Sequence, residues 1–419
     1  MAAAAVLMNF YPRHTVILDG GFSIIECRAE EGTISRLDDF PVGQGEHVVR
    51  ADGGYRAFVP PPLPPGVALD TDLVIRLSAA DRSVGELSGV GRSLPSQHLL
   101  SGALVRREAV LSSKIEGTQA SLSDLALFEA GQPAAGGGGD VREVFNYVAA
   151  MDHVLDPQRQ LPISLRLLRD AHRILLSGVR GGYATPGEFR TTQNWIGQPG
   201  AVVDTATYVP PPPERMWECL DAFEKHLHAG PELPPLLNIA ALHYQFEAIH
   251  PFVDGNGRVG RLLVVLLLVE WGLLPGPMLD LSAYIEPRRD RYYEALLRVS
   301  THGDWRGWFS FFLEVIEQQA RDAGNRAQRL HDLRKEMRQR VATARASALL
   351  PVLVDQLFQT PAITINLAKD VLGVTHRAAS LNVDKLIAAK ILREVPSSSR
   401  TRVFIASEVI NAIEGGPSA

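Results

Sequence analysis

The chain has few cysteines, no long uninterrupted apolar run and only a small excess of one charge. Cys27 and Cys219 are its two cysteines, and they form neither a metal-ligand pattern nor a disulfide framework, which fits a reducing cytoplasm. The longest apolar run, about residues 259–273, is interrupted by charges and is too short to cross a bilayer. Residues 1–7 lack the basic start and the length of a signal peptide. We therefore expect a cytoplasmic protein without a membrane segment.

The formal net charge of −5 over 419 residues argues against bulk electrostatic binding of nucleic acid or of membranes. The length allows two or three domains with a sizeable core. One short stretch combines histidine, aspartate, glycine and arginine residues within twelve positions. Residues 250–261 read His-Pro-Phe-Val-Asp-Gly-Asn-Gly-Arg-Val-Gly-Arg.

Glycines and arginines in this stretch predict a site for phosphate groups. Gly255 and Gly257 permit positive φ angles and close approach of the backbone, so that successive N–H groups can face an anion. The apolar residues that follow predict a buried helix starting near Asn256, whose free N–H groups and positive dipole end face the same loop. Arg258 and Arg261 lie three residues apart on its first turn, and each can bind phosphate oxygens with two N–H groups.

The same stretch contains a candidate metal ligand and a candidate base. Asp254 can bind a hard cation such as Mg²⁺, which prefers a carboxylate together with substrate phosphates. His250 can be neutral at physiological pH and accept a proton from a nucleophile. Residues 250–261 therefore predict a site that handles phosphate groups.

This stretch resembles the Fic-family signature, His-Pro-Phe-x-(Asp/Glu)-Gly-Asn-Gly-Arg-x-x-Arg, at every specified position. Most Fic enzymes transfer AMP from ATP to a hydroxyl of a protein side chain and release pyrophosphate. The resemblance implies that His250 is the general base and that Asp254 holds Mg²⁺ between the α- and β-phosphates. It also implies that Asn256 and the loop amides stabilise the α-phosphate, with Arg258 and Arg261 on the β- and γ-phosphates.

A second resemblance lies upstream, at residues 112–117, Ser-Ser-Lys-Ile-Glu-Gly. It is similar to the inhibitory motif of the family, (Ser/Thr)-x-x-x-Glu-(Gly/Asn), in which Ser112, Glu116 and Gly117 are the matching residues. The resemblance implies that Glu116 pairs with Arg261 in a bidentate manner and prevents productive ATP binding. The simpler alternative is a solvated glutamate at a helix end, with Gly117 as the C′ residue.

A third resemblance concerns Gly187–Thr191 and the segment that follows. Thr205–Val209 is β-branched and aromatic and precedes four prolines, which predicts a short exposed strand ended by a rigid turn. By resemblance this β-hairpin is a flap whose Thr207, Tyr208 and Val209 hold a target peptide by strand addition. An ordinary surface hairpin is the alternative. The helix containing Tyr292 and Tyr293 would help to line an adenine pocket.

We expect an all-α Fic core with this small hairpin flap. Val16–Leu18 and Phe22–Ile25, separated by Asp-Gly-Gly, indicate a β-hairpin near the start. Apolar periodicity predicts core helices at residues 140–156, 163–177, 214–229, 234–249, 284–299 and 303–343. The expected divisions are a partly β N-terminal extension (1–56), a helical region with the inhibitory helix (57–130), the catalytic core (131–335) and a C-terminal module (346–415).

The C-terminal module resembles an α+β winged helix-turn-helix. Helices are predicted at residues 350–358 and 366–372 and from Thr375 to about Ala389, with Thr375 as the N-cap of the recognition helix. Strands near residues 391–395 and 403–405 would form the wing. Residues 375–402 contain six basic and two acidic residues, a net charge of +4, which favours nucleic acid. Over 346–419 seven basic and six acidic residues leave only +1, so a docking or dimerisation domain is an equal alternative.

The favoured function is therefore an autoinhibited adenylyltransferase that uses ATP and Mg²⁺ and modifies hydroxyls of target proteins and of itself. Three alternatives stay open, namely removal of AMP, use of another nucleotide donor, and an ATP-sensing regulator that binds DNA. Homodimerisation is compatible with the sequence but does not follow from it. The target protein, its acceptor residue and the nucleotide base are not determined by these patterns.

Overall fold

The computed structural model describes residues 44–51, 53–93, 97–132, 139–179, 185–198, 200–230, 232–342, 348–396 and 401–415. The hairpin predicted at Val16–Ile25 lies outside these ranges. Among the described residues no helix combines the length and the apolar character needed to cross a bilayer.

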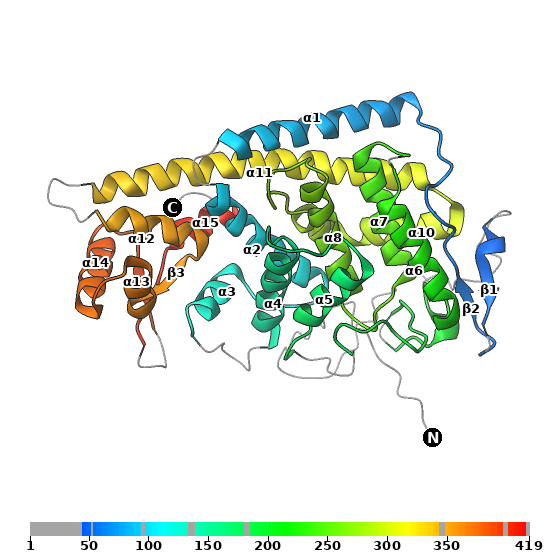
Figure 1. The fold of residues 1–419 in the computed structure, drawn as a ribbon, viewed down its shortest axis with the longest axis horizontal. Helices are drawn as coiled ribbons and strands as arrows, with labels where there is room; N and C mark the ends of the chain where they lie inside the picture. The colour runs from blue at the N-terminus through cyan, green and yellow to red at the C-terminus, as the bar shows by residue number, and fades with distance from the viewer. Residues whose placement is uncertain are drawn as a thin grey trace, which may run out of the picture.

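Helices dominate the part of the chain up to residue 341 (Figure 1). They are α1 (Thr71–Ser93), α2 (Gln97–Ile115), α3 (Leu122–Glu129), α4 (Gly139–Val154), α5 (Leu165–Leu175), α6 (Pro213–His228), α7 (Pro235–Ile249), α8 (Asn256–Glu270), α9 (Ser282–Ile285), α10 (Arg289–His302) and α11 (Trp305–Val341). Short 3₁₀ turns occur at Gly45–His47, Val203–Thr205 and Glu286–Arg288. The all-α prediction for the core is therefore confirmed.

Helices α7 and α8 form the centre of this bundle because nearly all of their side chains are buried. They pack against each other, with α4 and α5 on one side and α10 and α11 on the other. The 37-residue α11 lies alongside α1 for much of its length and continues to the C-terminal module (Figure 1). The loop between α7 and α8 is thereby held in the interior at both ends.

The predicted helix boundaries agree with the structure to within a few residues, with one exception. The helix predicted at 284–299 is divided into α9, a 3₁₀ turn and α10. Pro287 lies in that turn, and a proline inside a helix removes a backbone hydrogen bond and clashes with the preceding turn. After this break, α10 packs against α7 and α11.

The small β pieces differ from the prediction. Strands β1 (Val48–Arg50) and β2 (Arg56–Phe58) form an antiparallel hairpin that the sequence did not reveal. The predicted flap strand contains only one antiparallel bridge, between Ile196 and Tyr208. Its expected exposure is wrong for Tyr208 and Val209, which are buried, because the Tyr208 hydroxyl donates to the Ala248 carbonyl of α7 at 2.7 Å.

The C-terminal elements are α12 (Leu350–Gln359), β3 (Ala362–Thr364), α13 (Ile365–Leu372), α14 (His376–Ala388), β4 (Arg393–Val395), β5 (Val403–Ile405) and α15 (Ser407–Glu414). The three strands pair antiparallel in the order β3-β5-β4. Thr375 caps α14, accepting a hydrogen bond from the Ala378 N–H, as expected for that residue. Strand β3 and helix α15 were not predicted. Helices α12 and α15 pack against α2, so this module contacts the helix that precedes Glu116.

Candidate active site

The loop between α7 and α8 folds on itself through Asn256. The Phe252 N–H donates to the Asn256 side-chain oxygen at 2.9 Å, and the Asn256 amide donates back to the Phe252 carbonyl at 2.8 Å. Gly255 has a φ of 80° and caps the N-terminus of α8, a conformation that a side chain would strain. Asn256 is buried, so the amide predicted to face a phosphate is used here to shape the loop.

His250 ends α7 in the left-handed conformation, with φ 49° and ψ 59°. Its Nδ1 lies 3.2 Å from the Glu247 carbonyl oxygen, which can only accept a hydrogen bond, so the proton belongs on Nδ1 and Nε2 keeps its lone pair. Burial, together with the Arg190 guanidinium, lowers the pKa of His250 to about 4. A neutral imidazole with a free acceptor nitrogen is what a general base requires.

Arg190 and Asn194 hold the loop in this strained conformation. The Arg190 Nε donates to the His250 carbonyl at 3.0 Å, and its Nη2 donates to the Pro211 carbonyl at 2.5 Å. The Asn194 amide donates to the His250 and Phe252 carbonyls at 3.3 and 2.9 Å. Arg190 is 1% exposed, so a buried charge supports the backbone of the candidate base.

His172 supports the other side of the loop from α5. Its Nδ1 accepts from the Gly187 N–H at 2.8 Å, which leaves Nε2 to donate to the Asp254 carbonyl at 2.9 Å. Its ring stacks on Phe252, with 3.8 Å between centroids and 9° between planes. Burial lowers the pKa of His172 to about 4, so it acts as a neutral hydrogen-bonding group.

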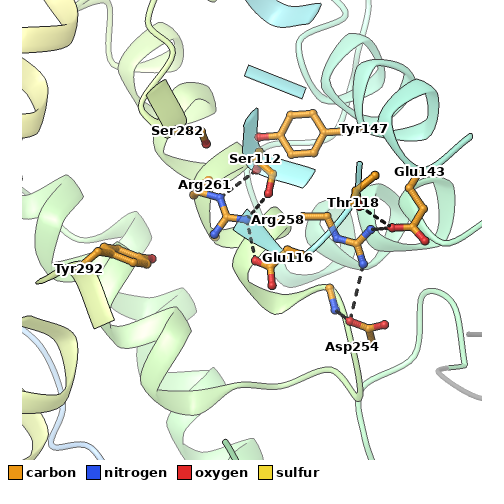
Figure 2. A network of polar contacts seen from close by, with 12 residues as sticks. Ser112, Glu116, Thr118, Glu143, Tyr147, Asp254, Arg258, Arg261, Ser282 and Tyr292 are labelled. Carbon is orange, nitrogen blue, oxygen red and sulfur yellow. Dashed lines mark hydrogen bonds and ion pairs between the residues drawn. The ribbon is translucent and has the colours of Figure 1, made fainter. Parts of the chain in front are cut away.

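The first motif arginine already has an acidic partner. Arg258 is buried, and its Nη1 lies 3.0 Å from a Glu143 oxygen of α4, while Nη2 lies 3.6 Å from Asp254 (Figure 2). Thr118 donates to the same Glu143 oxygen at 3.3 Å. Burial raises the pKa of the Glu143 carboxyl, with Arg258 opposing the rise. This contact joins α4, α8 and the segment after α2.

The second motif arginine contacts the predicted inhibitory residues (Figure 2). The Arg261 Nε donates to the Ser112 Oγ at 2.8 Å, and Nη2 donates to the Ser112 carbonyl at 3.0 Å and to the Glu116 Oε1 at 2.7 Å. One carboxylate oxygen is involved, so the pair is not bidentate as expected. Glu116 is only 16% exposed at its side chain, which rules out the solvated-glutamate alternative.

Two glycines make this pairing possible. Gly117 has a φ of 96° and ends the turn after α2, so the C′ role anticipated for it is also correct. Gly257 has a helical backbone rather than the expected positive φ. It matters because the absence of a side chain leaves room for Glu116 and Arg261. A Cβ at this position would overlap the Glu116 carboxylate and lie 2.9 Å from the Arg261 Nη1.

Helix α2 is pinned to the core next to these residues. The buried Glu108 accepts from the Ser282 N–H at 2.9 Å and from its hydroxyl at 2.6 Å, and from Tyr147 at 3.3 Å. Burial raises the pKa of Glu108 to about 7, an effect that the Ser282 hydrogen bonds oppose. Arg107 pairs with the buried Asp280. The position of Glu116 therefore rests on contacts that extend well beyond its own side chain.

A cavity of about 310 Å³ opens beside these groups. Its wall includes His250, Gly257 and Arg261 from the motif, Glu116 from the segment after α2, and Thr207 and Tyr208 from the flap region. Helices α7 and α10 supply further lining residues, namely Tyr244, Glu247, Ala248, Asp290, Tyr292, Tyr293, Glu294, Leu296, Leu297 and Ser300. One concave site thus brings together the candidate base, the second arginine, Glu116 and an aromatic wall.

Comparison with known proteins now decides the family. A model described as Fic/DOC family matches residues 162–268, and one described as Fic/DOC family N-terminal matches residues 74–156. The chain contains a Fic/DOC-family domain. The two matched stretches contain Ser112–Gly117, His250 and both motif arginines, so the Fic domain coincides with the site described above.

Curated relatives that match this Fic domain include insect proteins. The chain is 32% identical over 165 residues to proteins from Drosophila grimshawi and Drosophila virilis, each called protein adenylyltransferase Fic. The match covers 38% of this chain and 30% of each relative, so the chain spans less than a third of their length. The likeness is therefore one of domains rather than of whole proteins.

A solved structure shows the same fold over more of the chain. The Fic family protein from Desulfovibrio desulfuricans G20 has a TM-score of 0.53 and covers 82% of this chain and 98% of its own. Its sequence identity is 20%, so this likeness concerns the fold alone.

Magnesium would have one carboxylate of the Fic motif as its protein ligand. Within the described ranges, no group of three or more His, Cys, Asp or Glu residues could hold a metal ion. Asp254 stands at the loop with its side chain 30% exposed, beside Arg258. A single carboxylate completed by phosphates and water fits the coordination habits of Mg²⁺, so the donor set is compatible with the expected ion.

Several residues of the site were missed by sequence reasoning. Glu143, His172, Arg190, Asn194 and Glu247 are brought to the loop from other helices and segments. The likeness of Gly187–Thr191 to the family points to this segment, which contains Arg190, but it does not indicate what Arg190 does. A buried cationic motif also predicts acidic partners, although not their positions.

Proposed function

We propose that this chain is a protein adenylyltransferase that transfers AMP from ATP to Ser, Thr or Tyr hydroxyls of target proteins, itself included. The observation that carries the proposal is the neutral His250, which lines one cavity with Arg261 at the start of α8. The names of the insect relatives support the same activity. Catalysis of this type depends on positioning and charge neutralisation, which this loop is built to provide.

The proposed reaction has one bond formed and one broken at phosphorus. The acceptor hydroxyl oxygen bonds to the α-phosphorus, the bond between this phosphorus and the α–β bridging oxygen breaks, and pyrophosphate leaves. His250 Nε2 accepts the hydroxyl proton. The Gly257 amide at the start of α8 would face the α-phosphate, on a loop kept in shape by Asn256, whereas the Gly255 N–H already donates to the Asp254 carboxylate at 2.5 Å.

The remaining motif residues would neutralise the negative charge that develops on the leaving pyrophosphate. Arg258 and Arg261 bind the β- and γ-phosphates through paired N–H groups. Asp254 would hold Mg²⁺, which neutralises charge on the bridging phosphates when bound. The flap residues Thr207, Tyr208 and Val209 would place the target hydroxyl, with Thr207 as the more accessible of the three.

We further propose that Glu116 inhibits the enzyme. Its pairing with Arg261 occupies the guanidinium that would bind the γ-phosphate, and Ser112 occupies the other two N–H positions in use. Replacing Glu116 by glycine removes the carboxylate, and glycine can still adopt the backbone conformation of the turn before Gly117. Arg261 then keeps its two contacts with Ser112, and the N–H group released from Glu116 becomes available to the γ-phosphate.

Transfer of label from α-³²P-ATP onto protein with Mg²⁺ tests both proposals. Wild type, Glu116→Gly and Glu116→Gly/His250→Ala are compared. We expect labelling to rise at least about tenfold in the first variant, since one charge-assisted contact of about 1.5–3 kcal/mol is released, and to vanish in the second. Unchanged labelling in Glu116→Gly would contradict autoinhibition. Absence of label in all three would contradict ATP as the donor.

Removal of AMP is the alternative reaction for the same site. Glu116 lies beside Arg261 in the cavity wall, where a carboxylate could align a water molecule. Incubation of a premodified target with wild type and Glu116→Gly separates the two directions. Loss of AMP that requires Glu116 would favour the reverse reaction.

We also propose that α12 to β5 form a winged helix-turn-helix, with α14 as recognition helix. Arg377 and Lys385 are exposed on α14, but so are Asp384 and Leu381. Arg402 pairs with Glu394 at 2.7 Å, which removes part of the expected positive charge. A docking role is therefore favoured over DNA binding, and a gel-shift assay of the full chain with the DNA of its own operon distinguishes them.

A further inference from the structure

Glu247 is a carboxyl of the cavity wall that the mechanism above does not use. It lies on α7 one turn before His250, and its side chain is partly exposed toward the cavity. Its Oε1 is buried without a hydrogen-bond partner. Among the described residues we find no hydrogen bond or ion pair to either oxygen. A carboxyl of the cavity wall therefore has unused hydrogen-bonding capacity beside the proposed nucleotide site.

Gly260 provides the space that this carboxyl occupies. A Cβ at Gly260 would overlap the Glu247 Oε1 and would lie 3.3 Å from His243. Gly260 directly precedes Arg261 on α8, so the carboxyl is placed next to the residue that is proposed to bind the terminal phosphate. The two positions between the motif arginines are unspecified in the family signature, yet in this chain one of them accommodates Glu247.

The groups around Glu247 come from four parts of the chain. They are Arg261 of α8, Glu116 after α2, His243 and His250 on its own side, and Tyr292 and Tyr293 of α10. Burial lowers the pKa of His243 to about 3 and of His250 to about 4, and it raises the pKa of both tyrosines. These four side chains therefore stay uncharged between about pH 7 and pH 9.

Glu247 itself changes charge near that range. Burial raises its pKa to about 8, Arg261 opposes the rise and the Glu116 carboxylate adds to it. An ionised Glu247 would repel a phosphate bound to Arg261, whereas the neutral acid can donate its hydrogen to a phosphate oxygen.

We propose that Glu247 is a third contact for the terminal phosphate of the donor, and that it binds this phosphate as an uncharged acid. Nucleotide binding then takes up one proton from solvent whenever Glu247 is ionised beforehand. The inference rests on the proposed function, because it names how the triphosphate is recognised. It makes Glu247 a specificity-determining residue that distinguishes ATP from nucleotides with fewer phosphates.

The direction of the pH effect follows from the neighbouring charges. Removing Glu116 removes a like charge, so the pKa of Glu247 is lower in the nucleotide-free Glu116→Gly variant than in wild type. A bound γ-phosphate places negative charge near Glu247 again and therefore raises the pKa of this carboxyl. ATP affinity is therefore fully present below the pKa of the free variant and declines above it, by about tenfold per pH unit.

Calorimetry of nucleotide binding tests the inference without relying on turnover. The parent is Glu116→Gly/His250→Ala, titrated with ATP and Mg²⁺ at pH 7, 8 and 9, and the matched variant adds Glu247→Gln, which keeps the size and shape against Gly260. We expect ATP affinity of the parent to fall about tenfold from pH 8 to pH 9, and that of the glutamine variant to stay nearly constant. AMP, which lacks the β- and γ-phosphates, should show no such loss of affinity in either protein.

Proton uptake gives a second measurement that needs no substitution at position 247. Titration of the parent at pH 9 in buffers of different ionisation enthalpy should show close to one proton taken up per ATP and none per AMP. Equal pH dependence in the parent and the glutamine variant, or equal dependence for ATP and AMP, overturns the role of Glu247 and leaves the proposed activity intact. Absence of ATP binding in both proteins at every pH instead overturns ATP as the donor.

Discussion

Replacing Arg190 with lysine tests whether the candidate base depends on a buried guanidinium. Arg190 donates to the carbonyls of His250 at 3.0 Å, Pro211 at 2.5 Å and Thr192 at 3.3 Å, using three different nitrogens. Lysine keeps the positive charge but has one nitrogen in place of three. At least one of the carbonyls that shape the loop then loses its donor, and His250 loses support for its left-handed backbone.

The expected loss can be worked out from these contacts. A hydrogen bond to a charged group contributes about 1.5–3 kcal/mol, so the loss of two of the three lowers the free energy of unfolding by about 3–6 kcal/mol. In a domain of some 150–250 residues each kcal/mol lowers the melting temperature by about 2–4 °C, so we expect a fall of roughly 10 °C. Burial lowers the pKa of Arg190 to about 10, which leaves it charged at neutral pH.

Thermal melting followed by circular dichroism gives the stability, and label transfer in the Glu116→Gly background gives the activity. Arg169→Lys is the matched control, because Arg169 is 34% exposed and contacts the same segment through the Gly187 carbonyl at 2.8 Å and Glu188. We expect it to cost less than about 1 kcal/mol. If Arg190→Lys melts within 2 °C of wild type and labels normally, Arg190 does not hold the loop.

Two further predictions concern acid and metal. Burial lowers the pKa values of His172, His243 and His250 to about 4, 3 and 4, so below about pH 6.5 each of these groups costs up to about 1.4 kcal/mol per pH unit. Burial raises the pKa values of Glu108 and Glu247 to about 7 and 8, so these carboxyls take up protons in the folded chain and oppose that loss. Replacing both carboxyls by glutamine removes the opposing groups, so thermal melting of this double variant should show a larger loss than wild type between pH 7.5 and pH 5.5, and an equal loss in both would contradict the reasoning. Asp254→Asn should weaken ATP binding at least about tenfold with Mg²⁺ but not with EDTA, measured by calorimetry; equal loss in both would assign Asp254 to the loop alone.

Much of the helical core could be read from the sequence because its apolar patterns are long. Residues 234–249 and the run after Asn256 predicted α7 and α8 closely, since each buries a nearly continuous apolar surface. Short elements had no comparable signal. The β1–β2 hairpin has three residues in each strand, and β3 has three, so neither contains enough alternation to be distinguished from a loop.

The flap was mispredicted for a related reason. Its β-branched and aromatic residues correctly indicated extended backbone, but the exposure of a strand depends on what lies beside it. Tyr208 packs on the core because its hydroxyl reaches the Ala248 carbonyl of α7, a contact 40 residues away in the chain. A local pattern contains no information about such a partner.

The residues of the candidate site also fall into two groups, those that can be inferred from the motif and those that only the fold brings to it. Groups that shape the loop from within, such as Asn256 with Phe252, lie four residues apart and can be inferred from the motif. The charges of the motif are instead balanced from a distance, Arg258 by Glu143 and Arg261 by Glu116, across 115 and 145 residues. A buried arginine requires such a partner because an uncompensated charge in the interior is costly. A contiguous cationic motif therefore predicts that acidic residues converge on it, while only the fold decides which of them balance structure and which, like Glu116, occupy the place of a substrate.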